Sequence, residues 1–353
     1  MGDSVKKGEL KAIDYFTLLI LGGTALCLVA FSPLAREGAS KGLALAESTV
    51  LPSLLPLLII FLTIMKTGAG ALLSKAAGAI THRLFNLPAS CSAAIIFGLT
   101  GGYPTGAVLT EELYKNGEID EKQARRLMRF NFCGGCGFII TAIGSAVLNN
   151  IRAGLILFFS NIISAVFVGI ILSFTEKRDR YEYYYFSSPL PFGDALNSAV
   201  SGAVNSVLSI TAYIVIFSAL SNIINIPDFL LPLLEITGGL CKGGFSIPVT
   251  AALLSFGGVC IHLQLTKTLS QIKMKFLDFL IFRVICSLLS YGTARLFLIV
   301  FPIETAVFAD LSSRQVSLTS ANIPLSLLLI AGCFVIVLDI GSKKNFANAV
   351  DKP

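Results

Sequence analysis

The chain has 353 residues, of which 54% are hydrophobic and only 14% are charged. Its mean hydropathy is +0.79, whereas a soluble globular domain carries about 25% charged residues, so an assembly of soluble domains is excluded. The 27 basic residues outnumber the 21 acidic ones, but in a membrane protein basic residues mark topology. A nucleic-acid partner is therefore not expected, and the lipid bilayer is the first predicted partner.

The apolar residues gather into runs of about 18 or more, each able to cross about 30 Å of hydrocarbon as a helix. The first run, Tyr15–Phe31, follows three lysines and could be a signal peptide or a retained helix. Because no small-residue cleavage site follows it closely, we expect a retained helix. Further spans are predicted at Leu51–Met65, Asn131–Asn149, Ala153–Phe174, Ala203–Ile224, Ser255–Gln271, Phe276–Phe301 and Ile323–Ile340.

Two other apolar pieces, Pro88–Leu113 and Asp228–Leu254, are interrupted by glycine-rich clusters. Such breaks leave backbone groups unpaired, which hydrocarbon forbids unless the break is buried in protein or lines a wet cavity. If both pieces are re-entrant hairpins and the N-terminus is inside, most of the 27 basic residues fall on the inner side, as the positive-inside rule requires. We therefore predict an all-α polytopic membrane protein with about eight transmembrane helices plus two re-entrant hairpins, and with both termini cytoplasmic.

The order span, hairpin, span, span occurs twice, with the first hairpin entering from inside and the second from outside. Thr100-Gly101-Gly102 recurs as Thr237-Gly238-Gly239, and an amphipathic segment, expected to lie on the membrane surface, precedes each unit at Gly38–Ser48 and Asp194–Gly202. We therefore predict an inverted repeat. The chain divides into an N-terminal transmembrane helix (1–35), a first repeat (36–180), a second, inverted repeat (181–305) and a C-terminal helix and tail (306–353).

Inverted repeats with broken helices are typical of secondary transporters, which bind substrate near the membrane midplane at the repeat interface. Exposed N–H groups at hairpin tips favour anions, and free carbonyls favour cations. The glycines could instead serve close helix packing. The candidate substrate-binding residues are Gly101, Gly102, Tyr103, Thr105, Gly106, Asn131, Thr237, Gly238, Gly239, Lys242, His262 and Gln264.

Lys242 is the most informative charge, because an ammonium group in the membrane zone is costly unless it pairs or lines a wet site. It predicts a counter-charge for an anionic substrate, with snorkelling to the surface or pairing with Glu235 as alternatives. Glu235 is a candidate for proton or cation coupling, with pairing to Lys242 or to a backbone amide as its alternative. His262 could relay protons or be held by a neighbouring backbone group, and Asn131 could be a helix cap or a ligand donor.

Other chemistry has little support in the sequence. Cys133 and Cys136 have the spacing of half a zinc site, but no second pair matches them, so no metal is expected. Because the chain lacks a nucleophile elbow, a Walker loop and an H-E-x-x-H motif, we expect neither an enzyme nor a cofactor. The composition leaves a homo-oligomer open.

The stretch Gly101–Ala107 with Glu111–Tyr114, and the later stretches Leu234–Gly239 and Ser255–Gln264, resemble motifs of the sporulation integral membrane protein YlbJ family, within the nucleoside-recognition or Gate domain group. The resemblance implies a transporter or facilitator for dipicolinic acid, a small anionic solute. It also implies a place in the bacterial cytoplasmic membrane, namely the mother-cell-derived membrane around the forespore. A nucleoside-like solute transporter and a non-transporting assembly factor for spore maturation are the alternatives.

The chain departs from the family pattern at two places. The first family motif usually begins Ser-Gly-Tyr-Pro, where this chain has Gly101 in the serine position, and Phe132, Cys133 and Cys136 replace a polar stretch. A less polar lining is expected, which affects the identity of the substrate and leaves the architecture unchanged.

Overall fold

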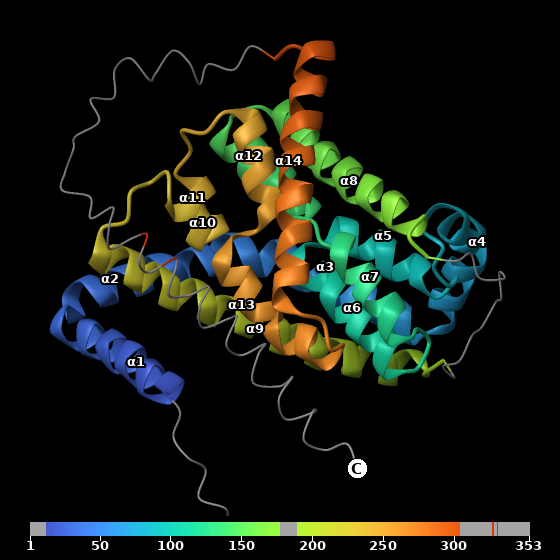
Figure 1. The fold of residues 1–353 in the computed structure, drawn as a ribbon, viewed down its shortest axis with the longest axis horizontal. Helices are drawn as coiled ribbons and strands as arrows, with labels where there is room; N and C mark the ends of the chain where they lie inside the picture. Colours follow the sequence, from blue (N-terminus) through green and yellow to red (C-terminus); the bar gives the residue numbers. More distant parts are fainter. Residues whose placement is uncertain (1–11, 177–188, 304–326, 328–329, 331–353) are drawn as a thin grey trace, which may run out of the picture.

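A computed structural model describes residues 12–176 and 189–303 together with residues 327 and 330, and all regular elements in these ranges are helices (Figure 1). The elements are α1 (Ala12–Ala30), α2 (Ser32–Leu45), η1 (Ala46–Val50), α3 (Leu51–Lys66), α4 (Gly68–Phe85), α5 (Cys91–Gly101), α6 (Tyr103–Lys115), α7 (Glu121–Phe130), η2 (Gly137–Val147), α8 (Ile151–Ser173), α9 (Phe192–Ile224), α10 (Leu231–Leu234), α11 (Ile236–Cys241), α12 (Ile247–Phe256), α13 (Gly258–Gln271) and α14 (Phe276–Val300).

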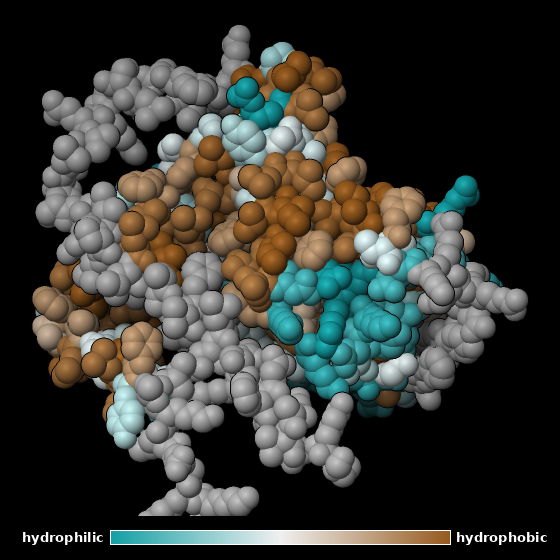
Figure 2. All heavy atoms as spheres, viewed as in Figure 1, coloured by the Kyte–Doolittle hydropathy of each residue, from teal (hydrophilic) through white to brown (hydrophobic). Residues whose placement is uncertain are grey.

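Helices long enough to cross a bilayer dominate the described residues. Five stretches qualify by length and composition, namely Ser32–Lys66, Ile151–Ser173, Phe192–Ile224, Ile247–Gln271 and Phe276–Val300. Apolar side chains cover much of the outer surface (Figure 2), as lipid contact requires. A multi-pass helical membrane protein is thereby confirmed. The predicted span Ile323–Ile340 lies outside the described residues, and the count of about eight spans stays a prediction.

The two amphipathic segments expected on the membrane surface do not form separate helices. Gly38–Ser48 lies inside the continuous helical stretch that runs from Ser32 to Lys66, and Asp194–Gly202 lies in the first part of α9. Each segment is thus part of a longer helix, and its placement on the membrane surface stays a prediction. Their small residues face another helix, and a helix that packs closely against a partner also has one face of distinctive composition.

That partner is the other long helix, because α2–α3 and α9 lie side by side in opposite directions (Figure 1). At one end, a Cβ atom added to Gly38 would lie 2.5 Å from the carbonyl oxygen of Ser218. At the other end, the backbone N–H of Leu190 donates to the carbonyl of Lys66 over 2.9 Å. Each predicted repeat contributes one of these helices, so their antiparallel course agrees with an inverted repeat.

The first interrupted piece turns at Gly102, where α5 ends and α6 begins. Gly102 has φ 111°, which side chains disfavour. Asn131, which follows α7, occupies the space between the two arms, and its Nδ2 donates to the carbonyl of Ala94 over 2.9 Å. A Cβ atom at Gly98 or Gly106 would overlap with Asn131, so these two glycines let the chain pass between the arms.

The second interrupted piece has a different form. It consists of the short helices α10 and α11, a non-helical segment over 242–246, and α12. At Gly257, with φ 90°, α12 turns into α13, and the two together are long enough to span a bilayer. The predicted hairpin arm thus continues into the predicted next span, and the re-entrant course of both pieces stays a prediction.

The backbone is also broken after α7, where residues 131–136 separate it from η2. Arg283 of α14 donates from Nη1 to the carbonyl of Phe132 over 3.0 Å and from Nη2 to the carbonyl of Arg129. Its guanidinium carbon also lies 4.7 Å from the centre of the Phe132 ring. A fully buried arginine therefore takes the place of water at carbonyls that hydrocarbon could not satisfy.

The break after α12 has side-chain donors of its own. The Tyr103 hydroxyl donates to the carbonyl of Leu254 over 2.8 Å, and Nε2 of His262 donates to the carbonyl of Phe256 over 2.9 Å. Tyr103 belongs to the first predicted repeat and Arg283 to the second. Each break is therefore closed partly by a residue from the other half of the chain.

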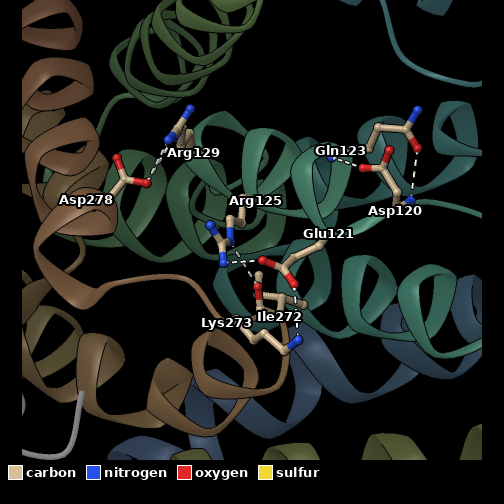
Figure 3. A network of polar contacts seen from close by, with 8 residues as sticks. All are labelled: Asp120, Glu121, Gln123, Arg125, Arg129, Ile272, Lys273 and Asp278. Atoms are coloured by element: carbon tan, nitrogen blue, oxygen red, sulfur yellow. Dashed lines mark hydrogen bonds and ion pairs between the residues drawn. The ribbon is translucent and has the colours of Figure 1, made fainter. Parts of the chain in front are cut away.

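A polar region over α6 and α7 interrupts the apolar surface (Figure 2). Asp120 caps α7, with Gln123 as the reciprocal partner of a capping box. Figure 3 shows how α7 then joins the start of α14, through the ion pair between Arg129 and Asp278 at 2.8 Å. Arg125 reaches the carbonyl of Ile272 at 3.3 Å. If both interrupted pieces are re-entrant and the N-terminus is inside, the predicted topology places Arg125 and Arg129 on the inner side.

We predict that Arg283→Met lowers the melting temperature of the detergent-purified chain by at least about 5 °C, since it leaves two buried carbonyls without donors, each at about 1–3 kcal/mol. Arg295→Met is the matched control, because Arg295 lies on the same helix and is exposed. Thermal unfolding followed by circular dichroism measures both changes. Equal melting temperatures for the two variants would contradict the role of Arg283.

Candidate functional site

Both interrupted pieces contribute to one chamber with a volume of about 60 Å³. Gly101, Gly102 and Tyr103 line it from the first piece, and Glu235 and Thr237 line it from the second. The rest of the lining comes mainly from α3, α9, α13 and the start of η2. Residues far apart in the chain thus meet around one chamber.

Each interrupted piece packs against a glycine-rich break in the backbone that follows it in the same predicted repeat. A Cβ atom at Gly135 would lie 3.2 Å from the carbonyl oxygen of Gly101, and one at Gly258 would lie 3.0 Å from that of Pro232. A larger residue at either position would have to displace the tip. The glycines at these breaks therefore serve close packing, and that packing in turn forms the wall of the chamber.

Glu235 is the one carboxylate in the chamber lining of the described chain. Its side chain is only 3% exposed. Its two carboxylate oxygens accept hydrogen bonds from the backbone N–H groups of Thr237, at 2.8 Å, and Gly238, at 2.6 Å. Of the alternatives for Glu235, the structure shows the pairing with backbone amides, and Lys242 has a different partner.

The remaining polar groups of the chamber are neutral. Tyr103 is almost completely buried and links the lining to α12 through its hydroxyl. Gln264 donates from its amide to the sulfur of Cys260 over 3.4 Å, and Ser53 donates to the carbonyl of Thr49 over 2.6 Å. The chamber therefore combines one carboxylate with a phenol, an amide and hydroxyl groups.

A much larger cavity, of about 980 Å³, adjoins the chamber and shares Ser53, Gly137 and Phe138 with it. Lys242 lies on the wall of this outer cavity, and its ammonium pairs with Asp228 at 2.6 Å. Side-chain exposure of 52% for Lys242 and 70% for Asp228 shows that the pair is open to the surroundings. The structure thus places Lys242 outside the chamber.

Other predicted site residues lie away from both cavities. Gly106 and Asn131 pack inside the first hairpin, and Gly239 packs against Pro232. Thr105 is fully buried. His262 is fully buried among aromatic rings, with Phe256 and Phe279 edge-on to it, and its bond to a backbone carbonyl is the alternative foreseen for it.

The sequence interpretation missed Asp228 and the clamp made by Arg283. Asp228 lies 14 residues before Lys242, a spacing that no helical pattern indicates. Arg283 lies within the predicted span Phe276–Phe301. An isolated arginine in an otherwise apolar span is the signal that could have identified it, because such a charge needs a buried partner.

Comparison with known proteins gives a distant match over most of the chain. The sporulation integral membrane protein YlbJ of Bacillus subtilis (strain 168) is 22% identical over 345 residues, which cover 81% of this chain and 84% of that protein. No family model matches the chain, and no solved structure matches it significantly. Kinship with the wider nucleoside-recognition or Gate group stays a prediction. Taken with the helical membrane fold, the match shows that this chain is similar over most of its length to the sporulation integral membrane protein YlbJ.

Proposed function

We propose that the chain is a transporter or facilitator that moves a small organic anion across a membrane of the sporulating cell, with dipicolinic acid as the substrate. The observation that carries the proposal is the single chamber lined by both interrupted pieces. Discontinuous helices bring backbone and side-chain polar groups to the middle of a membrane, where an unbroken helix presents none. The homologue's sporulation role and the resemblance to its family support the choice of substrate.

The size of the chamber favours a mobile hairpin mechanism. A volume of about 60 Å³ holds roughly four to six water molecules, which is too little for an aromatic dicarboxylate. The outer cavity of about 980 Å³ is in the size range of small-molecule sites. In the proposed mechanism the anion first binds in the outer cavity and enters the chamber when the hairpin tips separate.

Lys242 suits the first step. An exposed ion pair such as Lys242–Asp228 contributes only about 0–1 kcal/mol, so a substrate carboxylate can replace Asp228 at little cost. Glu235 suits the second step, because a carboxylate in the chamber repels an anion unless it takes up a proton. The described chamber lining holds no second carboxylate and no basic side chain. Glu235 is thus the proposed coupling residue, and a proton accompanies the anion.

One observation favours a second candidate, a nucleoside-like solute. The described chamber lining contains no basic side chain, and Tyr103 and Gln264 offer an aromatic ring and an amide, which suit an uncharged base. If the chain were an assembly factor without transport, neither solute would bind.

We predict that Lys242→Ala reduces the initial rate of labelled dipicolinate uptake into proteoliposomes by at least about fivefold, because the first binding site loses its counter-charge. Lys41→Ala is the matched control, since Lys41 is a similarly exposed lysine paired with Glu37 at 2.6 Å and does not line the outer cavity. Uptake that survives Lys242→Ala would overturn the counter-charge role. Uptake of uridine in place of dipicolinate would favour the second candidate, and uptake of neither would favour an assembly factor.

We also predict that Glu235→Gln makes dipicolinate uptake insensitive to an imposed pH gradient, because a neutral amide neither repels the anion nor exchanges a proton. In the native chain, an inwardly directed proton gradient should raise the initial rate several-fold. The measurement compares uptake with and without the gradient at equal protein density, with Glu37→Gln as the exposed control. A gradient response that persists in Glu235→Gln would contradict coupling through this residue.

A further inference from the structure

An apolar groove of about 460 Å³ lies between the beginning of α8 and the end of α14. Leu155 and Phe159, four residues apart on one face of α8, form one wall. Phe297 of α14 and Phe301, which directly follows α14 and donates from its backbone N–H to the carbonyl of Phe297 over 2.7 Å, form the other. Phe159 is 48% exposed and Phe301 is 59% exposed, so the groove opens to the surface of the molecule.

Arg152 lies at one end of this groove, as the second residue of α8. Its side chain is exposed and makes no hydrogen bond or ion pair with other residues that the structure describes. The groove lining in this part of the chain contains no acidic residue, and α8 has none along its length. The guanidinium group therefore lies exposed beside an apolar surface, and no acidic side chain of α8 or of the described groove lining neutralises its charge.

The depth of these residues matches the dimensions of a lipid. With 23 residues, α8 is about 35 Å long, slightly more than the hydrocarbon core of about 30 Å, so Arg152 lies at headgroup level. Leu155 and Phe159 lie about 5 and 10 Å deeper along the helix. A phosphate beside Arg152 would thus have its acyl chain alongside Phe159 and Phe297.

We propose that this groove binds one anionic phospholipid, with its phosphate on Arg152 and one acyl chain between the aromatic side chains of α8 and α14. The planar guanidinium pairs with phosphate oxygens through two parallel hydrogen bonds, and the apolar walls accept the chain. The site is separate from both cavities of the proposed transport path. It does not depend on which solute is transported.

The lipid also has a structural consequence. Gly154, two residues after Arg152, packs directly against Gly144 of η2, and η2 forms part of the wall of the outer cavity. A lipid that holds the beginning of α8 against α14 therefore stabilises the position of α8. Because η2 packs against α8, the lipid also stabilises the η2 wall of the outer cavity.

The test uses the full chain in detergent, analysed by native mass spectrometry with phosphatidylglycerol or phosphatidylcholine of identical acyl chains. The native protein should retain one phosphatidylglycerol with a preference of about fivefold, and Arg152→Gln should abolish that preference. Arg295→Gln is the matched control, because Arg295 is an exposed arginine on α14 outside the groove lining, and it should leave the preference intact.

A second variant tests the acyl-chain contact. Phe159→Ala should weaken retention of both lipids to a similar degree, since it removes apolar surface and no charge. An unchanged lipid preference in Arg152→Gln would overturn the proposal, and it is the result expected if residues 304–353 occupy the groove. Equal loss of preference in Arg152→Gln and Arg295→Gln would also overturn it, since it would show a general charge effect.

Discussion

The structure depends on one constraint, which is that a helix broken within hydrocarbon must find protein donors for the carbonyls at its open end. Arg283 meets this need after α7, and Tyr103 and His262 meet it after α12. Two of these three donors cross from one predicted repeat to the other. The breaks that make a polar chamber available are thus the same features that hold the two halves of the chain together.

The chamber and the outer cavity differ in ways that follow from this arrangement. Close packing of each tip on a glycine-rich break leaves the chamber small, and the short helix α11 turns two backbone N–H groups onto Glu235. The one basic side chain near the path, Lys242, lies in the described wall of the wide cavity, where its pairing with Asp228 is exposed and weak. The position of Lys242 in the outer cavity and of Glu235 in the chamber suits an anion that enters the chamber together with a proton.

The apolar runs and glycine clusters predicted the membrane class and the residues Gly101, Gly102, Tyr103, Glu235 and Thr237 of the chamber, because unpaired backbone in a membrane has few tolerable locations. The sequence was less informative where one residue type serves two purposes. An amphipathic pattern around Gly38 arises equally from a surface helix and from packing on α9, and Asn131 fits a ligand donor as well as a packed helix cap. The partner of Lys242 depends on the tertiary fold, since a loop brings Asp228 back to it. The same holds for Arg283, whose carbonyl partners are more than a hundred residues away.

The central claim is that substrate occupies the chamber between the hairpin tips, and native Cys260 reports on it directly. Cys260 lines the chamber and is only 1% exposed. In a variant that keeps Cys260 and has its other cysteines replaced by serine or alanine, the rate of alkylation by a small thiol reagent can be measured with and without dipicolinate. Dipicolinate should slow alkylation of Cys260 several-fold and leave a matched variant that keeps only Cys27, on the exposed surface of α1, unchanged. Equal rates at Cys260 with and without dipicolinate would contradict occupation of the chamber.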